Sequence, residues 1–132
     1  MSAMSSEQAE QIIQLFLNRF IRKDYAAMLD LFDEDVIFEF PYVPNPSPKQ
    51  LEGKTALQQH LQMLDKILAI TSFTTPIVNV SADSPVFFAQ FEGSGILLAD
   101  GKTYEQQYIS VVELRDDKIV RYQDYWNPLA MM

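Results

Sequence analysis

Hydrophobic residues recur at helical spacing from Ala9 to Phe20, with polar residues between them. This pattern predicts an amphipathic helix that ends near Arg22. Ser5 precedes the periodic positions and Gln8 follows it by three residues, which is the arrangement of a helix-capping box. We therefore expect a capped first helix that buries one face.

Two further helices are predicted in the first half of the chain. Asp24 precedes a short second helix whose hydrophobic positions include Met28 and Phe32. A third helix is expected over residues 54–69. The hydrophobic stripe of this third helix consists of Leu57, Leu61, Leu64, Ile67 and Leu68.

The pattern changes from helical spacing to alternation at Val36. Residues 36–40 alternate and Pro41 stops them, so we expect a first strand at an edge of the sheet. Residues 42–52 contain three prolines and are predicted to form an irregular, covering loop. Further strands are expected over residues 77–80, 86–98, 103–114 and 119–127, with a hairpin turn at Asp100-Gly101. Helices followed by a mainly antiparallel sheet predict an α+β fold with the helices on one face of the sheet.

Composition and charge narrow the classes of function. The chain of 132 residues has no cysteine and a formal net charge of −8. This length favours one domain over residues 1–132, without disulfides or thiolate metal sites. An acidic surface repels nucleic-acid phosphates and anionic membranes, and no hydrophobic run is long enough to span a bilayer. We expect a cytoplasmic protein with neither a nucleic-acid nor a membrane partner.

The last predicted strand places an acidic residue among aromatic ones. One face carries Val120, Tyr122, Asp124 and Trp126, and the other carries Ile119, Arg121, Gln123 and Tyr125. If the first face is buried, the loss of solvent raises the pKa of Asp124, which then suits proton transfer. The alternative is a structural Asp124 that is hydrogen-bonded to the backbone or to a neighbouring tyrosine.

His60 is the only histidine and lies on the stripe of the predicted third helix, between Leu57 and Leu64. It is either a core residue or a group for acid–base chemistry, because its ordinary pKa lies near neutral pH. If this helix crosses the concave face of the sheet, His60 and Asp124 face the same cavity. One histidine without cysteines gives too few ligands for a metal site, and no glycine-rich phosphate loop occurs. We therefore expect no metal and no cofactor.

Many aromatic residues fall on the predicted strands, and most of them must belong to the core. Those on the concave face would line a pocket that suits a flat hydrophobic ligand with a few polar groups. The predicted lining consists of Phe38, Phe91, Tyr108, Tyr122 and Trp126. Ser110 and Tyr108 are expected to hydrogen-bond a carbonyl oxygen of the ligand. Gly93-Ser94-Gly95 lies inside a strand pattern, which indicates a bulge or bend that leaves room for the cavity.

The order of the elements resembles the SnoaL-like (nuclear transport factor 2-like) superfamily over nearly the whole chain. The resemblance is carried by Phe40-Pro41 at a strand end, by Leu51-Glu52-Gly53 before a helix, and by Tyr125-Trp126-Asn127-Pro128. Within the superfamily, the phenazine-biosynthesis A/B proteins are the most similar, matching Gly93-Ser94-Gly95, Tyr104-Glu105, Glu113-Leu114, Lys118-Ile119 and the segment from Asp124 to Pro128. The resemblance implies a cone, with three helices packed on the concave face of a curved, mainly antiparallel mixed sheet.

The phenazine-biosynthesis family implies a homodimer that helps two ketone-bearing molecules condense, with a histidine and a glutamate in proton transfer. His60 matches that histidine, seven residues after Gly53, and Asp124 matches that glutamate, three residues before Asn127. Aspartate is one methylene shorter than glutamate, which withdraws the carboxylate by about 1.5 Å. Leu64 stands where the family has a serine, and no residue is assigned as an anchor for a substrate carboxylate.

Two other activities of the superfamily fit this sequence less well. The resemblance to steroid isomerases places their base at Phe40, their acidic hydrogen-bond donor at Ser110, and their tyrosine at Phe16 or Phe20, so none of the three groups is present. Epoxide hydrolysis would need an arginine on the central strand, and residues 86–98 contain none.

The sequence thus predicts cofactor-free proton transfer on a small cyclic or aromatic keto compound, leading to isomerisation, condensation or dehydration. Asp124 is expected to be the general acid or base, with His60 as its partner. Two alternatives remain open. One is a protein that binds a small hydrophobic or aromatic metabolite without catalysis, and the other is a dimeric scaffold that works through the outer face of the sheet.

Overall fold

A computed structural model describes residues 4–131 of the protein. Helices α1 (Ser6–Ile21), α2 (Tyr25–Leu29) and α3 (Lys54–Leu64) precede most of the strands, and a short 3₁₀ helix (Pro128–Met131) follows the last one. The strands are β1 (Phe32–Glu39), β2 (Gln50–Glu52), β3 (Leu68–Phe73), β4 (Ile77–Val80), β5 (Val86–Leu97), β6 (Thr103–Arg115) and β7 (Lys118–Trp126).

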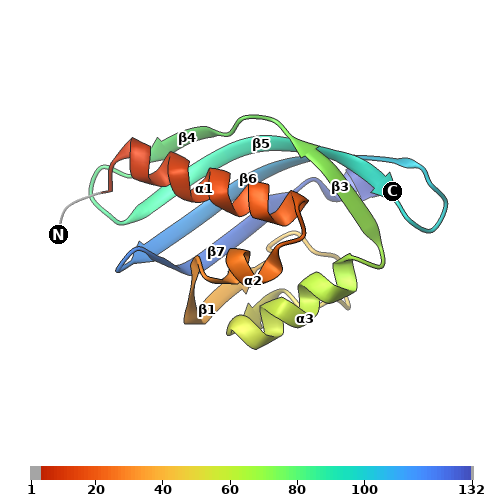
Figure 1. The fold of residues 1–132 in the computed structure, drawn as a ribbon, viewed down its shortest axis with the longest axis horizontal. Coiled ribbons are helices and arrows are strands. Elements are labelled where there is room, and N and C mark those ends of the chain that lie inside the picture. The colour runs from red at the N-terminus through yellow and green to blue at the C-terminus, as the bar shows by residue number, and fades with distance from the viewer. Residues whose placement is uncertain (1–3, 132) are drawn as a thin grey trace.

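Within residues 4–131, seven strands form one curved sheet in the order β2-β1-β7-β6-β5-β3, and β4 pairs with another part of β5. The pair β1–β7 is parallel and the other described pairs are antiparallel. The helices lie on the concave side of the sheet, with α3 against β1 and β2, and α1 against β3 and β4 (Figure 1). The predicted α+β cone is confirmed.

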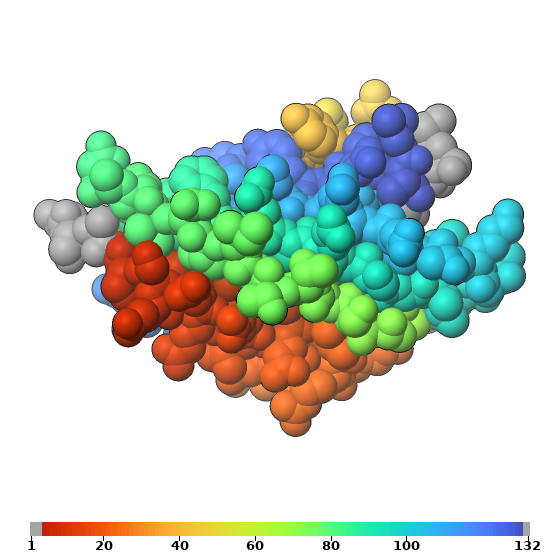
Figure 2. Space-filling model, turned by 90° about the horizontal axis from the view of Figure 1, so that it is seen from above, coloured from red at the N-terminus to blue at the C-terminus, as the bar shows by residue number. Residues whose placement is uncertain are grey.

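The top view shows how α1 covers the interior. The helix lies directly beside β3 and β4, and together they form a continuous surface (Figure 2). The interior between α1 and the sheet is therefore covered on this side.

Both N-terminal helices are capped by the predicted residues. Ser5 Oγ accepts a hydrogen bond from the backbone N–H of Gln8 at 3.1 Å, and Asp24 accepts one from the N–H of Ala27 at 3.3 Å. The second half of the capping box does not form. Gln8 Nε2 donates instead to Asp117 Oδ1 at 2.8 Å, which ties the start of α1 to the β6–β7 turn.

The predicted boundary between the second helix and the first strand is wrong. Phe32 is expected on the helix, but α2 ends at Leu29 and Phe32 begins β1, where it is buried. β1 is not an edge strand, because β2 lies beyond it. β2 arises in the segment predicted to be a loop, where residues 50–52 pair with residues 37–39. Three residues are too few to show alternation in the sequence.

α3 is also shorter than predicted. It ends at Leu64, and Leu68 begins β3 instead of completing the helical stripe. The end of α3 and the start of β3 both face the interior, so hydrophobic spacing does not reveal the boundary. β3 pairs with β5 and forms the other edge of the sheet.

A bulge in the β6–β7 pair changes which residues of β7 face inward. Glu113 pairs with Arg121, but the next residue, Leu114, pairs with Ile119, so Val120 is the extra residue of the bulge. Ile119 is therefore in the core at 1% exposure, although simple alternation places it on the outer face and Val120 on the inner one. Beyond the bulge, the predicted alternation of β7 applies.

Gly95 lets β3 approach β5 closely. A Cβ atom at Gly95 would lie 2.0 Å from the backbone oxygen of Ala69, which no side chain tolerates. The β3–β5 register shifts between Ile70 and Ser72, so the irregularity lies in β3. The bulge or bend predicted within residues 93–95 is thus found in the strand opposite them, while β5 pairs with β6 without a register shift.

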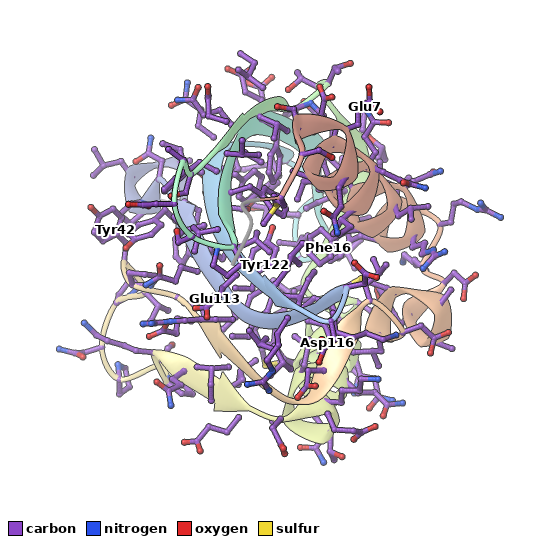
Figure 3. All side chains as sticks on the ribbon, turned by 90° about the vertical axis from the view of Figure 1, so that its left-hand side faces the viewer. Glu7, Phe16, Tyr42, Glu113, Asp116 and Tyr122 are labelled. Carbon is purple, nitrogen blue, oxygen red and sulfur yellow. The ribbon has the colours of Figure 1, made fainter. Side chains whose placement is uncertain are left out.

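Aromatic rings of α1 and of the sheet pack against one another in the interior. Phe16 of α1 and Tyr122 of β7 lie close together in the interior (Figure 3), with ring centroids 5.0 Å apart. Tyr122 also stacks on Phe38 of β1 at 4.6 Å. Tyr42, in contrast, lies at the periphery in the same view and is 57% exposed. The inner aromatic cluster forms one wall of a cavity.

Candidate functional site

A cavity of about 730 Å³ lies between the helices and the concave face of the sheet. Small-ligand sites occupy roughly 300–1,000 Å³, so this volume suits a ligand with several rings or a ring and a chain. The walls come from α1, α2 and α3, from the sheet, and from the segment after β1. Most of the lining is hydrophobic or aromatic, and includes Phe16, Phe20, Met28, Phe38, Leu57, Leu61, Phe73 and Phe91.

The structure brings most of the predicted site residues to this one cavity. Those that line it are His60, Asp124, Phe38, Phe91, Tyr108, Tyr122 and Trp126. Ser110 is the exception. It is fully buried outside the lining, and its hydroxyl is hydrogen-bonded to the hydroxyl of Tyr122. Ser110 is therefore placed to hold Tyr122 and not, as predicted, to contact a ligand itself.

Asp124 is the only acidic residue in the described lining of the cavity. It lies on β7 opposite Ser110 of β6, and no hydrogen bond within residues 4–131 reaches its carboxylate. Protein surrounds the carboxylate, and the surface that it retains faces the cavity. This burial raises the pKa of Asp124 from its ordinary 3.8 to about 7. The group therefore exchanges a proton near neutral pH.

His60 enters the cavity from α3, next to Phe40 at the end of β1. The centroids of the two rings are 4.8 Å apart. Burial lowers the pKa of His60 below its ordinary 6.5, because a charged imidazolium loses its solvation there. His60 is thus a neutral imidazole at neutral pH, and it can either donate or accept a hydrogen bond.

Two tyrosines of β6 add a pair of hydroxyl groups. The hydroxyls of Tyr104 and Tyr108 lie 3.1 Å apart, and the ring of Tyr108 stacks on Phe91 at 5.2 Å. Burial raises the pKa of both phenols, and the nearby charge of Asp124 adds to the effect, so both stay protonated. Tyr104 is a lining residue that the sequence analysis did not select. Its position four residues before Tyr108, on the same face of a strand, was the available signal.

The segment after β1 and the outer side of α3 form the most exposed part of the lining. Pro44 and Pro48 contribute from the segment, and Met63 contributes from α3 together with Ile67 just beyond it. All four residues are exposed, at 48% for Met63 and 43% for Ile67. The covering loop was predicted over residues 42–52, which include both prolines, and Ile67 was predicted on the stripe of the third helix, although α3 ends at Leu64. Met63 is not on that predicted stripe, so its place in the lining was not expected.

Among residues 4–131, His, Asp and Glu side chains form no group of three or more that could hold a metal ion. None of the described helices is both long and hydrophobic enough to cross a membrane.

Fold and cavity together define a class of protein. It has a curved mixed sheet, helices on its concave face, and a largely hydrophobic cavity lined by one partly buried acid, Asp124. The SnoaL-like domain model matches residues 13–122 of the chain. The protein therefore belongs to the SnoaL-like family, as the resemblance in the sequence predicted.

Proteins of Bacillus subtilis and Pseudomonas aeruginosa are among those similar to this chain. A crystal structure from Bacillus subtilis, provisionally described as an isomerase, has a TM-score of 0.90 at 43% identity, covering 96% of this chain and 92% of that one. The uncharacterised protein YesE of Bacillus subtilis (strain 168) is 43% identical over 125 residues, 95% of this chain and 85% of YesE. An uncharacterised PhzA/B-like protein of Pseudomonas aeruginosa is 31% identical over 121 residues, 92% of this chain and 85% of that protein.

Proposed function

We propose that the protein catalyses cofactor-free proton transfer on a cyclic or aromatic ketone held in the central cavity, with Asp124 as the general base. The observation that carries this proposal is the state of Asp124. A carboxylate without a hydrogen-bond partner among the described residues, inside a hydrophobic cavity, has a pKa of about 7. A structural aspartate would be hydrogen-bonded, whereas a general base works best when its pKa lies near the operating pH.

The chemistry follows from the groups around Asp124. Its carboxylate removes a proton from the carbon next to the ligand's carbonyl group. The electron pair of that C–H bond forms a double bond to the carbonyl carbon, and the π pair of the carbonyl moves to its oxygen, which gives an enolate. The Tyr104–Tyr108 pair holds two hydroxyl hydrogens, and the contact between the two oxygens uses only one of them. The other can donate to the enolate oxygen, which stabilises the charge that develops there.

The fate of the enolate decides which product forms. Return of the proton from Asp124 to a different carbon isomerises the ligand. Attack of the enolate carbon on a second carbonyl group gives condensation or ring closure, and departure of a hydroxide gives dehydration. His60 lines the same cavity as a neutral imidazole, so it is the group proposed to protonate the leaving or newly formed oxygen. The names of the similar proteins, a provisional isomerase and a PhzA/B-like protein, support this range of reactions.

Proton exchange tests the first step without knowledge of the natural substrate. We would incubate the protein with α-tetralone, a bicyclic aromatic ketone, in D₂O and follow loss of the α-proton signal by NMR. The wild-type protein is expected to accelerate exchange over buffer, and Asp124→Asn is expected to lose at least about 100-fold of that acceleration. The wild-type rate should rise with pH and level off above about pH 7, where Asp124 is ionised.

A matched control separates loss of the base from loss of the cavity. The same exchange is measured with Glu92→Gln, which neutralises an exposed acid on β5, and it should match the wild type. Binding is followed in parallel through the fluorescence of Trp126, the only tryptophan, which lines the cavity. If Asp124→Asn exchanges α-protons as fast as the wild type, Asp124 is not the base.

A second function is favoured by the hydrophobic character of the cavity. A binding protein needs the same volume and aromatic walls but no proton transfer. Saturable quenching of Trp126 by α-tetralone, without any exchange above buffer, would establish this non-catalytic function. If the cavity binds no ketone at all, the dimeric scaffold is the candidate function that remains.

A further inference from the structure

The charge of the cavity lining points to the class of ligand that can enter it. The ten lysines and arginines of the chain are all absent from the described lining. Its ionisable residues are Asp124, His60 and three tyrosines, and each of these is either neutral or negative near neutral pH. A ligand carboxylate inside the cavity would therefore meet no positive charge.

Several cationic groups of the helices and of β7 have partners outside the cavity lining. Arg19 Nη1 donates to the backbone oxygen of Ala27 at 2.8 Å, at the corner between α1 and α2. Lys54, at the start of α3, is 3.8 Å from Glu34, and Arg121 of β7 is 2.6 Å from Glu39. These contacts pair the positive charges with groups that do not line the cavity.

The polar groups that do line the cavity suit an uncharged carbonyl or hydroxyl group. Phenol hydroxyls, the imidazole of His60 and the indole N–H of Trp126 donate single hydrogen bonds without full charges. A neutral oxygen needs only one or two such bonds. A carboxylate needs more, or an opposite charge, to replace the water that it loses on entry.

We propose that the cavity selects uncharged cyclic ketones of drug size and excludes ligands that carry a carboxylate. The choice of a ketone rests on the proposed function, whereas the exclusion of anions rests only on the charge of the lining. The net charge of −8 acts in the same direction, because it repels anions before they reach the cavity.

Two probes of equal shape test this selectivity. One is α-tetralone with a carboxamide on its aromatic ring, and the other carries a carboxylate at the same position. Their affinities are measured near neutral pH by Trp126 fluorescence and confirmed by calorimetry. We expect the carboxamide to bind at least about tenfold more tightly, since the carboxylate alone must lose its hydration without compensation.

A variant that gains affinity completes the test, because misfolding could explain a loss of binding but not a gain. Met63 lines the cavity from α3 and is 48% exposed, so Met63→Lys adds a positive charge at the cavity without disturbing the core. This variant should bind the carboxylate about threefold to fivefold more tightly than the wild type does, with little change for the carboxamide. Gln62→Lys adds the same charge to an exposed neighbouring position outside the lining, and it should leave both affinities unchanged.

The outcomes separate this proposal from the proposed function. Equal or tighter binding of the carboxylate by the wild type overturns the selectivity, and so does failure of the carboxamide to bind. Selective binding of the carboxamide without α-proton exchange would uphold the selectivity and defeat the catalytic proposal. Exchange of α-protons together with unselective binding would uphold the catalytic proposal and defeat the selectivity.

Discussion

Replacing Asp124 with asparagine should change how the stability of the protein depends on pH. In the folded protein the pKa of Asp124 is about 7, whereas its ordinary value of 3.8 applies to the unfolded chain. Folding therefore favours the protonated acid. The contribution of this group to stability is complete below about pH 4 and is lost as the pH rises through about 7, because the unfolded chain releases the proton that the folded protein retains.

The magnitude follows from the two pKa values. The difference between 3.8 and about 7 corresponds to about 4 kcal/mol of lost stability at high pH. Of this, about 3 kcal/mol falls between about pH 5 and about pH 8. Asparagine has nearly the same shape but no charge, so the stability of Asp124→Asn does not fall through ionisation at this position. This figure is an upper limit, since water that enters the cavity solvates part of the charge.

The assay is urea unfolding of the wild type and Asp124→Asn at several pH values, followed by circular dichroism. We expect Asp124→Asn to be the more stable protein at about pH 8, with the advantage shrinking by up to about 3 kcal/mol at about pH 5. Differences between variants cancel the titration of the other carboxylates. Glu92→Gln, the exposed control, should differ from the wild type by the same small amount at every pH. A constant difference for Asp124→Asn, or a variant that is less stable at high pH, would refute the reasoning.

Two further predictions concern the frame of the site. Gly95→Ala should lower the free energy of unfolding by at least about 3 kcal/mol or prevent folding, because its Cβ would lie 2.0 Å from the Ala69 oxygen. The control Gly101→Ala has open space around it and only a positive φ to strain it, so it should cost about 1 kcal/mol. Comparable losses for the two variants in urea unfolding would contradict the close approach of β3. Ser110→Ala should lower the free energy of unfolding by about 1–3 kcal/mol, because it leaves the buried Tyr122 hydroxyl without its partner. Adding Tyr122→Phe should recover part of that loss, and additive effects of the two substitutions would show that the two hydroxyls do not interact.

The sequence determined the local elements wherever a residue's own neighbours fix its conformation. Ser5 and Asp24 cap their helices as predicted, because a cap bonds to backbone only three residues away. The long hairpin strands β5 and β6 were found from alternation sustained over many residues. The conflict between a charged side chain and its aromatic neighbours likewise singled out Asp124 before any geometry was known.

Other features depended on contacts between distant parts of the chain. The short strand β2 forms because residues 37–39 pair with it. The end of α3 at Leu64 cannot be seen in the hydrophobic pattern, because the start of β3 also faces the interior. The β6–β7 bulge moved Ile119 into the core, since the register of a sheet is set by the partner strand and not by the sequence of one strand alone.

Tertiary structure also decided what each candidate residue can do. Alternation placed Ser110 on an inward face, but only the packing shows that its hydroxyl bonds to Tyr122 and that it stays outside the cavity lining. The absence of lysine and arginine from the described lining could not be foreseen either, because no sequence pattern tells whether Arg19 turns toward a cavity or toward the backbone of Ala27. Residue types thus specified the available chemistry, whereas the fold set which groups meet, how much water they lose, and hence the pKa of Asp124.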